Sequence, residues 1–129
     1  MAMNILRKKI DQVLNDVKDS ALEIIFKRIP KEECAVFLYG SLAMGKTSNS
    51  ADIDIGIFCR EKIAHRTMAI IRNEIEEKAR TLREIDVIDF SDIEDTIFLK
   101  IALKKIKLWH QGRKVKEYFA HFISRNLKR

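Results

Sequence analysis

Two aspartates stand two residues apart in the stretch Asp52-Ile53-Asp54, and ten residues separate them from the pair Gly40-Ser41. Side chains at positions i and i+2 of a strand point to the same face, so the two carboxylates are expected side by side. Neighbouring carboxylates repel each other and are costly to hold together without a cation. Oxygen-only ligands suit Mg²⁺, which proteins usually hold by one or two carboxylates together with substrate phosphates. The pattern therefore predicts a magnesium-dependent site that acts on phosphates.

A third carboxylate completes this set if its strand lies beside the first. In the stretch 85–90, which reads IDVIDF, the candidates are Asp86 and Asp89. Period-two alternation places Asp86 toward the predicted metal face and Asp89 near the strand end, so Asp86 is favoured and Asp89 is the alternative. Three carboxylates can hold two Mg²⁺ ions, which clamp the attacking and leaving oxygens of an in-line phosphoryl displacement. Asp86 would then ligate the second ion and either lower the pKa of the attacking hydroxyl or accept its proton.

The Gly40-Ser41 pair has the residue types of a phosphate-binding turn. Gly40 has no side chain, so a phosphate can approach the backbone closely there. Ser41 adds a hydroxyl and a backbone N–H, and these donors suit a β- or γ-phosphate. Together with the carboxylates, the turn predicts a triphosphate as one substrate.

The hydrophobic pattern predicts the elements that must position these residues. Apolar residues recur with a helical period from Leu6 to Ile25, and Pro30 is expected to end this first helix. The polar loop after Ser41 is expected to open with one helical turn that Gly45 stops. Short buried or alternating runs predict three strands, and a 3.6-residue period predicts a second helix. The strands are expected at 34–39, 52–58 and 84–90, and the second helix at 61–82.

The last third of the chain predicts two more helices around a short extended segment. Residues 91–94, which read SDIE, have the spacing of a capping box and would begin a helix. The inner stripe of this helix is expected to contain Ile93, Ile97 and Ile101. An extended piece at 106–109 and a turn follow. The final helix is predicted to bury one face, made of Val115, Tyr118, Phe119, Phe122 and Ile123.

Length and composition narrow the class of protein. With 129 residues, the chain is expected to form one α+β domain that spans residues 1–129. No apolar stretch approaches the roughly 20 residues that cross a bilayer, and the N-terminal segment does not resemble a signal peptide. A cytoplasmic location without a membrane partner is therefore expected. Cys34 and Cys59 are expected to be reduced, buried thiols. Scattered histidines and the lack of a CxxC pair argue against a zinc site.

Positive charge is concentrated toward the C-terminus. Residues 100–129 hold ten Lys or Arg and one acid, whereas the first 99 residues hold 15 Lys or Arg and 18 Asp or Glu. These balances of +9 and −3 give the net charge of +6. A basic segment favours an acidic or polyanionic partner, although a solvated helix face is at least as common. Direct nucleic-acid binding is the weaker idea, and it predicts an affinity that falls steeply with salt.

The Gly-Ser pair at 40–41, the Asp-Ile-Asp at 52–54 and the later Asp86 together resemble the motif of the minimal nucleotidyltransferases of the DNA polymerase β superfamily. The tail LWHQGRKV around Gly112 is similar to the short C-terminal strand and turn of these proteins. The resemblance spans roughly residues 34–115. It implies a small mixed β-sheet flanked by helices, Mg²⁺, and transfer of a nucleoside monophosphate from a nucleoside triphosphate with release of pyrophosphate.

Small stand-alone members of this family are often the antitoxin of a HEPN/MNT toxin–antitoxin pair. There the implied activity is AMP transfer from ATP to a tyrosine hydroxyl of the partner HEPN ribonuclease, which silences the toxin. Homo- and hetero-oligomers both stay open. One alternative is a small-molecule nucleotidyltransferase, for instance one that modifies an aminoglycoside, but the chain has no residues for an acceptor-binding domain. Another is a non-catalytic antitoxin that neutralises its partner by binding.

One departure from the family motif concerns the phosphate site. Many relatives place arginine between the Gly-Ser pair and the next glycine, where this chain has Leu42 and Met44. The resemblance makes Lys46 the candidate that would replace this charge, although most loop lysines are only solvated. The predicted site is then Asp52, Asp54 and Asp86 for catalysis and metal binding, with Gly40, Ser41 and Lys46 for the nucleotide.

Overall fold

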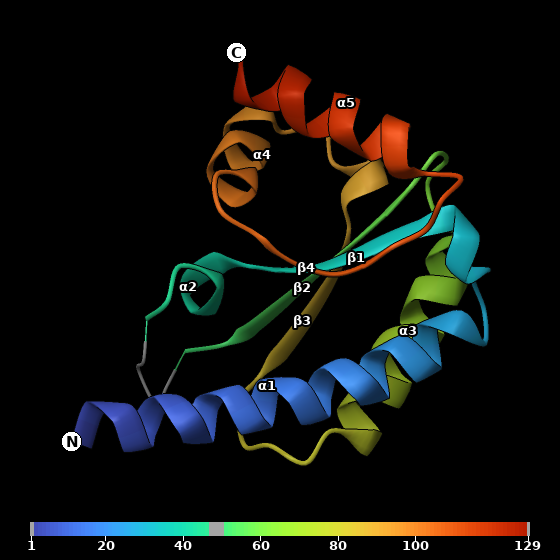
Figure 1. Cartoon of the computed structure of the whole chain (residues 1–129). Helices are drawn as coiled ribbons and strands as arrows, with labels where there is room; N and C mark the ends of the chain where they lie inside the picture. The colour runs from blue at the N-terminus through green and yellow to red at the C-terminus, as the bar shows by residue number, and fades with distance from the viewer. Residues whose placement is uncertain (1, 47–50, 129) are drawn as a thin grey trace.

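A mixed four-stranded sheet with helices on both faces forms the centre of the protein (Figure 1). The computed structural model describes residues 2–46 and 51–128. The strands are β1 (Cys34–Tyr39), β2 (Ile53–Cys59), β3 (Ile85–Asp89) and β4 (Lys107–Gln111). The sheet order is β3-β2-β1-β4, in which β1 runs antiparallel to β2 and β4, and β2 and β3 are parallel. The helices are α1 (Ala2–Phe26), α2 (Gly40–Ala43), α3 (His65–Lys78), α4 (Thr96–Leu103) and α5 (Lys116–Leu127), with 3-10 turns at Lys31–Glu33 and Phe90–Asp92.

The sheet separates two hydrophobic cores because strand residues alternate between its faces. All six residues of β1 are buried and contribute to the two cores in turn. The isoleucines of β2 pack toward α1 and α3, in the lower part of Figure 1. Phe37 of β1 packs on the opposite side against Phe119 of α5, with ring centroids 5.4 Å apart. The β2 isoleucines of the first core are Ile53, Ile55 and Ile57, so the alternate residue Asp54 faces the side of α4 and α5.

The predicted α+β architecture is confirmed, since helices flank a small mixed sheet. β1 has the predicted bounds, and the other three strands differ from prediction by one or two residues at their ends. The helical turn expected after Ser41 is present as α2, but it begins at Gly40. Residues 47–50 of the predicted polar loop lie outside the described residues.

The predicted end of the first long helix and both predicted ends of the second are wrong. α1 stops at Phe26, and a hydrogen-bonded turn carries the chain to Ile29 before Pro30. α3 spans 65–78 instead of 61–82. Its beginning is delayed because the Ile63 N–H donates to a side chain at the end of β3, and its end comes early because Ala79 is extended. Within the described ranges, no helix is long and apolar enough to cross a membrane.

The predicted beginning and inner face of the α4 helix are also wrong. Ser91 does not cap a helix, because its hydroxyl bonds to the backbone N–H and carbonyl of Cys59. The N-cap is Asp95, whose side chain accepts hydrogen bonds from the backbone N–H groups of Ile97 and Phe98. The helix buries Leu99, Ala102 and Leu103 and leaves Ile97 and Ile101 exposed. In α5, Phe119 and Phe122 are buried as predicted, whereas Tyr118 is exposed.

Candidate active site

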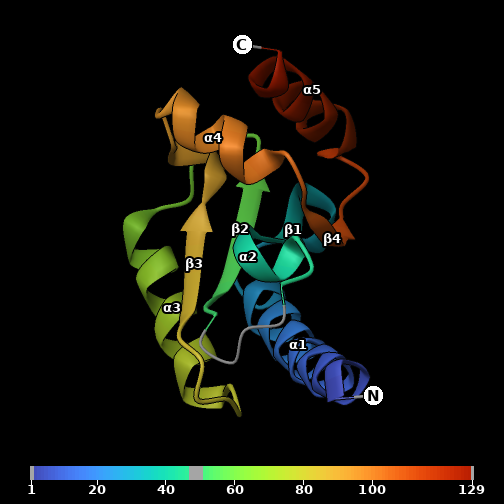
Figure 2. The same cartoon turned by 90° about the vertical axis from the view of Figure 1, so that its left-hand side faces the viewer.

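Asp54 and Asp86 are neighbours on adjacent strands. The register of the parallel pair β2 and β3 places Asp54 beside Asp86, as expected if these strands were adjacent. Asp52 stands just before β2 and is exposed, whereas Asp54 is partly buried. On the other side of β2, Tyr39 at the end of β1 is the register partner of Asp54. The strand positions of Tyr39, Asp54 and Asp86 are therefore side by side in the sheet. Figure 2 shows α2 beside these strands.

The surroundings of Asp54 raise the proton affinity of its carboxylate. Burial, and then the charges of Asp86 and Asp52, raises the pKa of Asp54 from 3.8 to about 6. The pKa of the Tyr39 hydroxyl is also raised, by burial first and then by Asp54 and Asp86, so this phenol stays protonated. Among residues 2–46 and 51–128, none of the three aspartates forms a salt bridge. The site therefore gathers negative charge that a bound cation would relieve.

Gly40 packs directly on Asp54 in a conformation that favours glycine. Its φ is +77°, in the left-handed region. A Cβ atom at this position would collide with the Asp54 carboxylate and lie 3.2 Å from its Cγ. Ser41 is partly buried, and its carbonyl accepts hydrogen bonds from the N–H groups of Met44 and Lys46, both at 3.2 Å. The predicted phosphate turn and the predicted metal ligands thus form one contiguous surface.

A basic side chain of α1 reaches the turn that follows Gly40 and Ser41. Lys46 is exposed, and the four residues after it lie outside the described ranges. Leu42, one of the residues between the Gly-Ser pair and the next glycine, is buried in the first core. Arg7 of α1 donates from Nη2 to the carbonyl of Gly45 at 3.1 Å. No pattern in the sequence predicts this contact, because the two residues are 38 positions apart.

Arg83 holds the chain just before Asp52. Its Nη1 donates to the carbonyl of Ala51 at 2.7 Å. Asp52, Arg83 and Asp86 line a hollow of about 480 Å³ beside the carboxylates. The hydrogen bond therefore fixes the position of Asp52 relative to β3. Arg83 falls between the predicted second helix and third strand, so the sequence gives no signal for this role.

The family of the chain follows from comparison with known proteins. Residues 8–114 match the family model described as "Polymerase beta, Nucleotidyltransferase". The chain belongs to this nucleotidyltransferase family. No curated protein matches the sequence as a relative. The family resemblance expected from the Gly-Ser and Asp-Ile-Asp motifs is thereby confirmed.

Several solved structures with the fold of this nucleotidyltransferase are toxin–antitoxin complexes. A crystal structure of a toxin–antitoxin with AMP-PNP is 16% identical, covers 86% of this chain and 84% of that chain, and has a TM-score of 0.65. The toxin–antitoxin MntA–HepT is 15% identical over 87% and 82% of the two chains, with a TM-score of 0.62. A structure of a tri-AMPylated Shewanella oneidensis HEPN toxin in complex with an MNT antitoxin is 18% identical. The match covers 98% of this chain and 87% of that chain, with a TM-score of 0.54. At these identities the likeness establishes the fold.

The donors of this nucleotidyltransferase suit Mg²⁺ in combination with a nucleotide. In the described part of the chain, no three Asp, Glu, His or Cys side chains are already arranged to hold a metal ion. Mg²⁺, however, is usually held by one or two carboxylates plus substrate phosphates. Asp54 and Asp86 supply such oxygen donors, and their mutual repulsion favours a cation. The residues therefore fit a magnesium–nucleotide complex better than an isolated ion.

Asp89, the alternative third carboxylate, has a structural role. It is buried, and its Oδ2 accepts a hydrogen bond from the N–H of Ile63 at 2.7 Å. Its Oδ1 accepts one from the N–H of Ser91 at 2.9 Å. Both carboxylate oxygens are therefore occupied in joining the end of β3 to the segment before α3. This arrangement favours Asp86 as the third carboxylate of the site.

We expect Asp89→Ala to lower the free energy of unfolding by about 2–3 kcal/mol, because buried N–H groups lose their acceptor. The measurement is urea unfolding followed by circular dichroism. Asp11→Ala is the control, since Asp11 is exposed on α1 and its removal should change stability by less than about 0.5 kcal/mol. Equal unfolding midpoints for Asp89→Ala and the wild-type protein would contradict the assignment.

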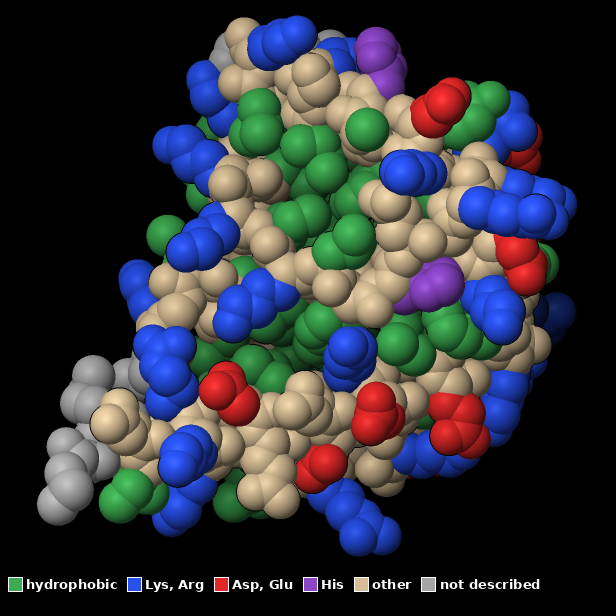
Figure 3. Space-filling model, viewed as in Figure 1, with side chains coloured by type: hydrophobic (Ala, Val, Ile, Leu, Met, Phe, Trp, Pro, Cys, Tyr) green, Lys and Arg blue, Asp and Glu red, His purple; other side chains and the backbone are tan. Residues whose placement is uncertain are grey.

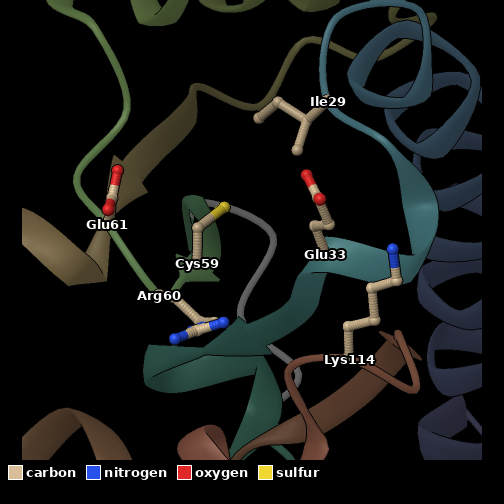
Figure 4. Close-up of a pocket in the computed structure, with 6 residues that line it drawn as sticks. All are labelled: Ile29, Glu33, Cys59, Arg60, Glu61 and Lys114. Atoms are coloured by element: carbon tan, nitrogen blue, oxygen red, sulfur yellow. The ribbon is translucent and has the colours of Figure 1, made fainter.

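A second hollow, of about 360 Å³, lies at the opposite end of β1 and β2 (Figure 4). Two acids and two bases line it, so their charges balance and do not favour a phosphate. The thiol of Cys59 also points into it, and Cys59 is the register partner of the buried Cys34. Both cysteines are free, and burial raises the pKa of each to about 12. This hollow is therefore left out of the candidate site. Cys34 is buried as predicted, whereas Cys59 is only partly buried. The charged lining residues are Glu33, Arg60, Glu61 and Lys114.

Proposed function

We propose that this protein is an antitoxin that transfers AMP from ATP to a tyrosine hydroxyl of a HEPN-type toxin. The observation that carries the proposal is the pairing of Asp54 and Asp86 on adjacent strands, with Gly40 packed against the first of them. Membership of the nucleotidyltransferase family supplies the reaction class. The fold neighbours include a complex with AMP-PNP and a complex of an AMPylated toxin, which supports ATP as donor and a toxin as acceptor.

The transfer exchanges one phosphate ester bond for another. The tyrosine oxygen forms a bond to the α-phosphorus of ATP, and the bond from that phosphorus to the oxygen bridging to the β-phosphate breaks. Pyrophosphate leaves with the bonding electrons. Asp86, which is exposed beside Asp54, accepts the phenolic proton or stabilises the phenolate as it forms.

The other site residues orient the nucleotide. Asp52, Asp54 and Asp86 would hold two Mg²⁺ ions, which would neutralise charge on the triphosphate when bound. Gly40 leaves the backbone open to a phosphate, and the Ser41 hydroxyl donates to it. Lys46 offers a further cation at the exposed end of the turn, close to the carbonyl that Arg7 contacts. Since ATP is the donor, we place the reaction in the cytoplasm.

The nature of the acceptor distinguishes this proposal from its alternatives. An enzyme that modifies a small molecule such as an aminoglycoside needs residues that hold this acceptor. All five helices of the described chain pack on the sheet or beside it, so they leave no second domain within residues 2–46 and 51–128 for that purpose (Figure 1). A macromolecular acceptor brings its own binding surface, which makes the toxin the better candidate.

The decisive experiment is intact-mass analysis of a HEPN-type partner from the same genome after incubation with this protein, ATP and Mg²⁺. We expect the partner to gain one or more AMP units. Asp86→Asn should abolish the gain, whereas Asp89→Asn, its matched control three residues away, should retain it below its unfolding temperature. An unchanged partner mass with a stable complex would favour neutralisation by binding. AMP transfer to an aminoglycoside instead would favour the small-molecule enzyme.

A further inference from the structure

The outer face of α4 is apolar although it faces solvent. Ile97 and Ile101 are 72% and 68% exposed, and they stand one helical turn apart on the same side of the helix. The helix does not need them for its own packing, because Leu99 and Leu103 already bury the opposite side. Single exposed apolar residues are ordinary, but two large ones aligned on one helix face form a stripe that a partner can cover.

This stripe lies close to the candidate active site. Phe98, the partly buried neighbour of Ile97 on α4, contacts the ring of Tyr39 edge-on, with centroids 6.1 Å apart. Tyr39 is the register partner of Asp54. One layer of aromatic side chains therefore separates α4 from the carboxylates, and Figure 2 shows α4 and α2 on the same side of the molecule. A protein bound to α4 would have its neighbouring segments within reach of the site.

The charge around the stripe identifies the chemistry of the partner. Residues 96–108 contain four lysines and no acid. Lys104, Lys105 and Lys107 are exposed just after the helix. Lys and Arg side chains also gather along the left-hand edge of Figure 3, which is the face turned to the viewer in Figure 2. Lysine around an apolar stripe matches a protein surface with apolar side chains and an acidic rim, whereas a nucleic acid would be held mainly by polar contacts to phosphates.

We propose that the α4 stripe, defined as Ile97 and Ile101 with the lysines that follow, is the surface on which the acceptor protein docks. The partner is identified as a HEPN-type toxin only through the proposed function, on which this inference rests. Docking on α4 positions the acceptor tyrosine over Asp54 and Asp86, and the acidic rim of the partner pairs with Lys104, Lys105 and Lys107. Affinity for the toxin and affinity for the nucleotide therefore depend on different residues.

The test is the dissociation constant for the HEPN-type partner, measured by calorimetry with the double variant Ile97→Asp/Ile101→Asp. We expect binding to weaken by at least roughly thirtyfold, as for an interface hot spot. The matched control is Ile5→Asp/Leu82→Asp, which adds the same charge at two exposed apolar positions. Ile5 lies on α1 and Leu82 follows α3, and these two helices cover the other face of the sheet. The control should bind the partner normally. Both variants should bind AMP-PNP with Mg²⁺ like the wild-type protein, which also shows that they are folded.

The outcomes separate docking from catalysis. Loss of binding in the α4 variant alone supports the surface, even if the wild-type protein transfers no AMP and the proposed function fails. Normal binding of the α4 variant, or no binding of the partner by the wild-type protein, overturns the surface. Loss of RNA binding by the α4 variant with normal toxin binding also overturns it, in favour of a nucleic-acid surface.

Discussion

Asp54→Asn is expected to lower AMP transfer by about three orders of magnitude and, at the same time, to stabilise the fold. Transfer falls because the variant loses a charged oxygen ligand where phosphate charge must be neutralised, and removal of one such electrostatic contact typically lowers rates by about 10²–10³ or more. Stability rises because burial and the charges of Asp86 and Asp52 destabilise the ionised form of Asp54 in the fold. A neutral amide of the same shape removes that repulsion.

The stability gain should depend on pH in a defined window. The pKa of Asp54 is raised from 3.8 to about 6 in the fold, so the folded protein binds this proton more tightly than the unfolded chain does. Wild-type stability from this group is therefore complete below pH 3.8 and is lost as the pH rises through about 6. Asparagine does not titrate, so Asp54→Asn should exceed the wild-type protein most above pH 6 and match it near pH 3.8.

Urea unfolding between pH 3.8 and pH 8 without metal or nucleotide checks this expectation. Asp11→Asn is a suitable control, because it removes the same charge from an exposed position of α1. The control should keep full transfer activity and show no such pH dependence. A wild-type transfer rate in Asp54→Asn would remove Asp54 from the catalytic set. Equal unfolding curves at pH 8 would show that the carboxylates do not repel one another in the metal-free protein.

The strands could be predicted from sequence because their local pattern and their environment agree. β1 is a continuous apolar run, and it lies in the middle of the sheet with both faces covered. β2 alternates isoleucine with other residues, so the face of Asp54 follows from the pattern alone. The pairing of Asp54 with Asp86 then needed two further assumptions, that the second and third strands are adjacent and that their register places these residues side by side.

α4 could not be placed correctly because its sequence, TIFLKIAL, is apolar on more than one face. A stripe through Ile97 and Ile101 and a stripe through Leu99 and Leu103 both satisfy a helical period. In the structure the second stripe is buried, and Asp95 rather than Ser91 caps the helix. Ser91 has the right residue type for a cap, but Cys59 uses its hydroxyl. Such competition between contacts distant in sequence has no local signal.

Site residues that depend on long-range contacts were missed for the same reason. Arg7 reaches Gly45 from the first helix, and Arg83 reaches Ala51 from a loop. Tyr39 belongs to neither motif, yet it lies beside Asp54, and burial together with the charges of Asp54 and Asp86 raises the pKa of its hydroxyl. Each of these residues supports the site from outside the motifs that predicted it.

Gly40→Ala is expected to lower AMP transfer at least a hundredfold. The φ of +77° costs a residue with a Cβ about 1–2 kcal/mol. The added methyl group would also occupy the position of the Asp54 carboxylate, which must move away. A displacement of about 1 Å in a reacting geometry can lower a rate by about 10²-fold. The measurement is the initial rate of AMP transfer, together with the free energy of unfolding from urea titration.

Gly45→Ala separates the two causes, because Gly45 has nearly the same backbone conformation without the carboxylate. Its φ is +83°, and the nearest atom to an added Cβ is Nη2 of Arg7 at 3.9 Å, an ordinary contact distance. Both variants should lose a similar amount of stability from the backbone, but only Gly40→Ala should also lose catalysis. Equal rates in the two variants would mean that Gly40 serves the turn alone. A much lower rate in Gly40→Ala would mean that the contact with Asp54 sets the geometry of the site.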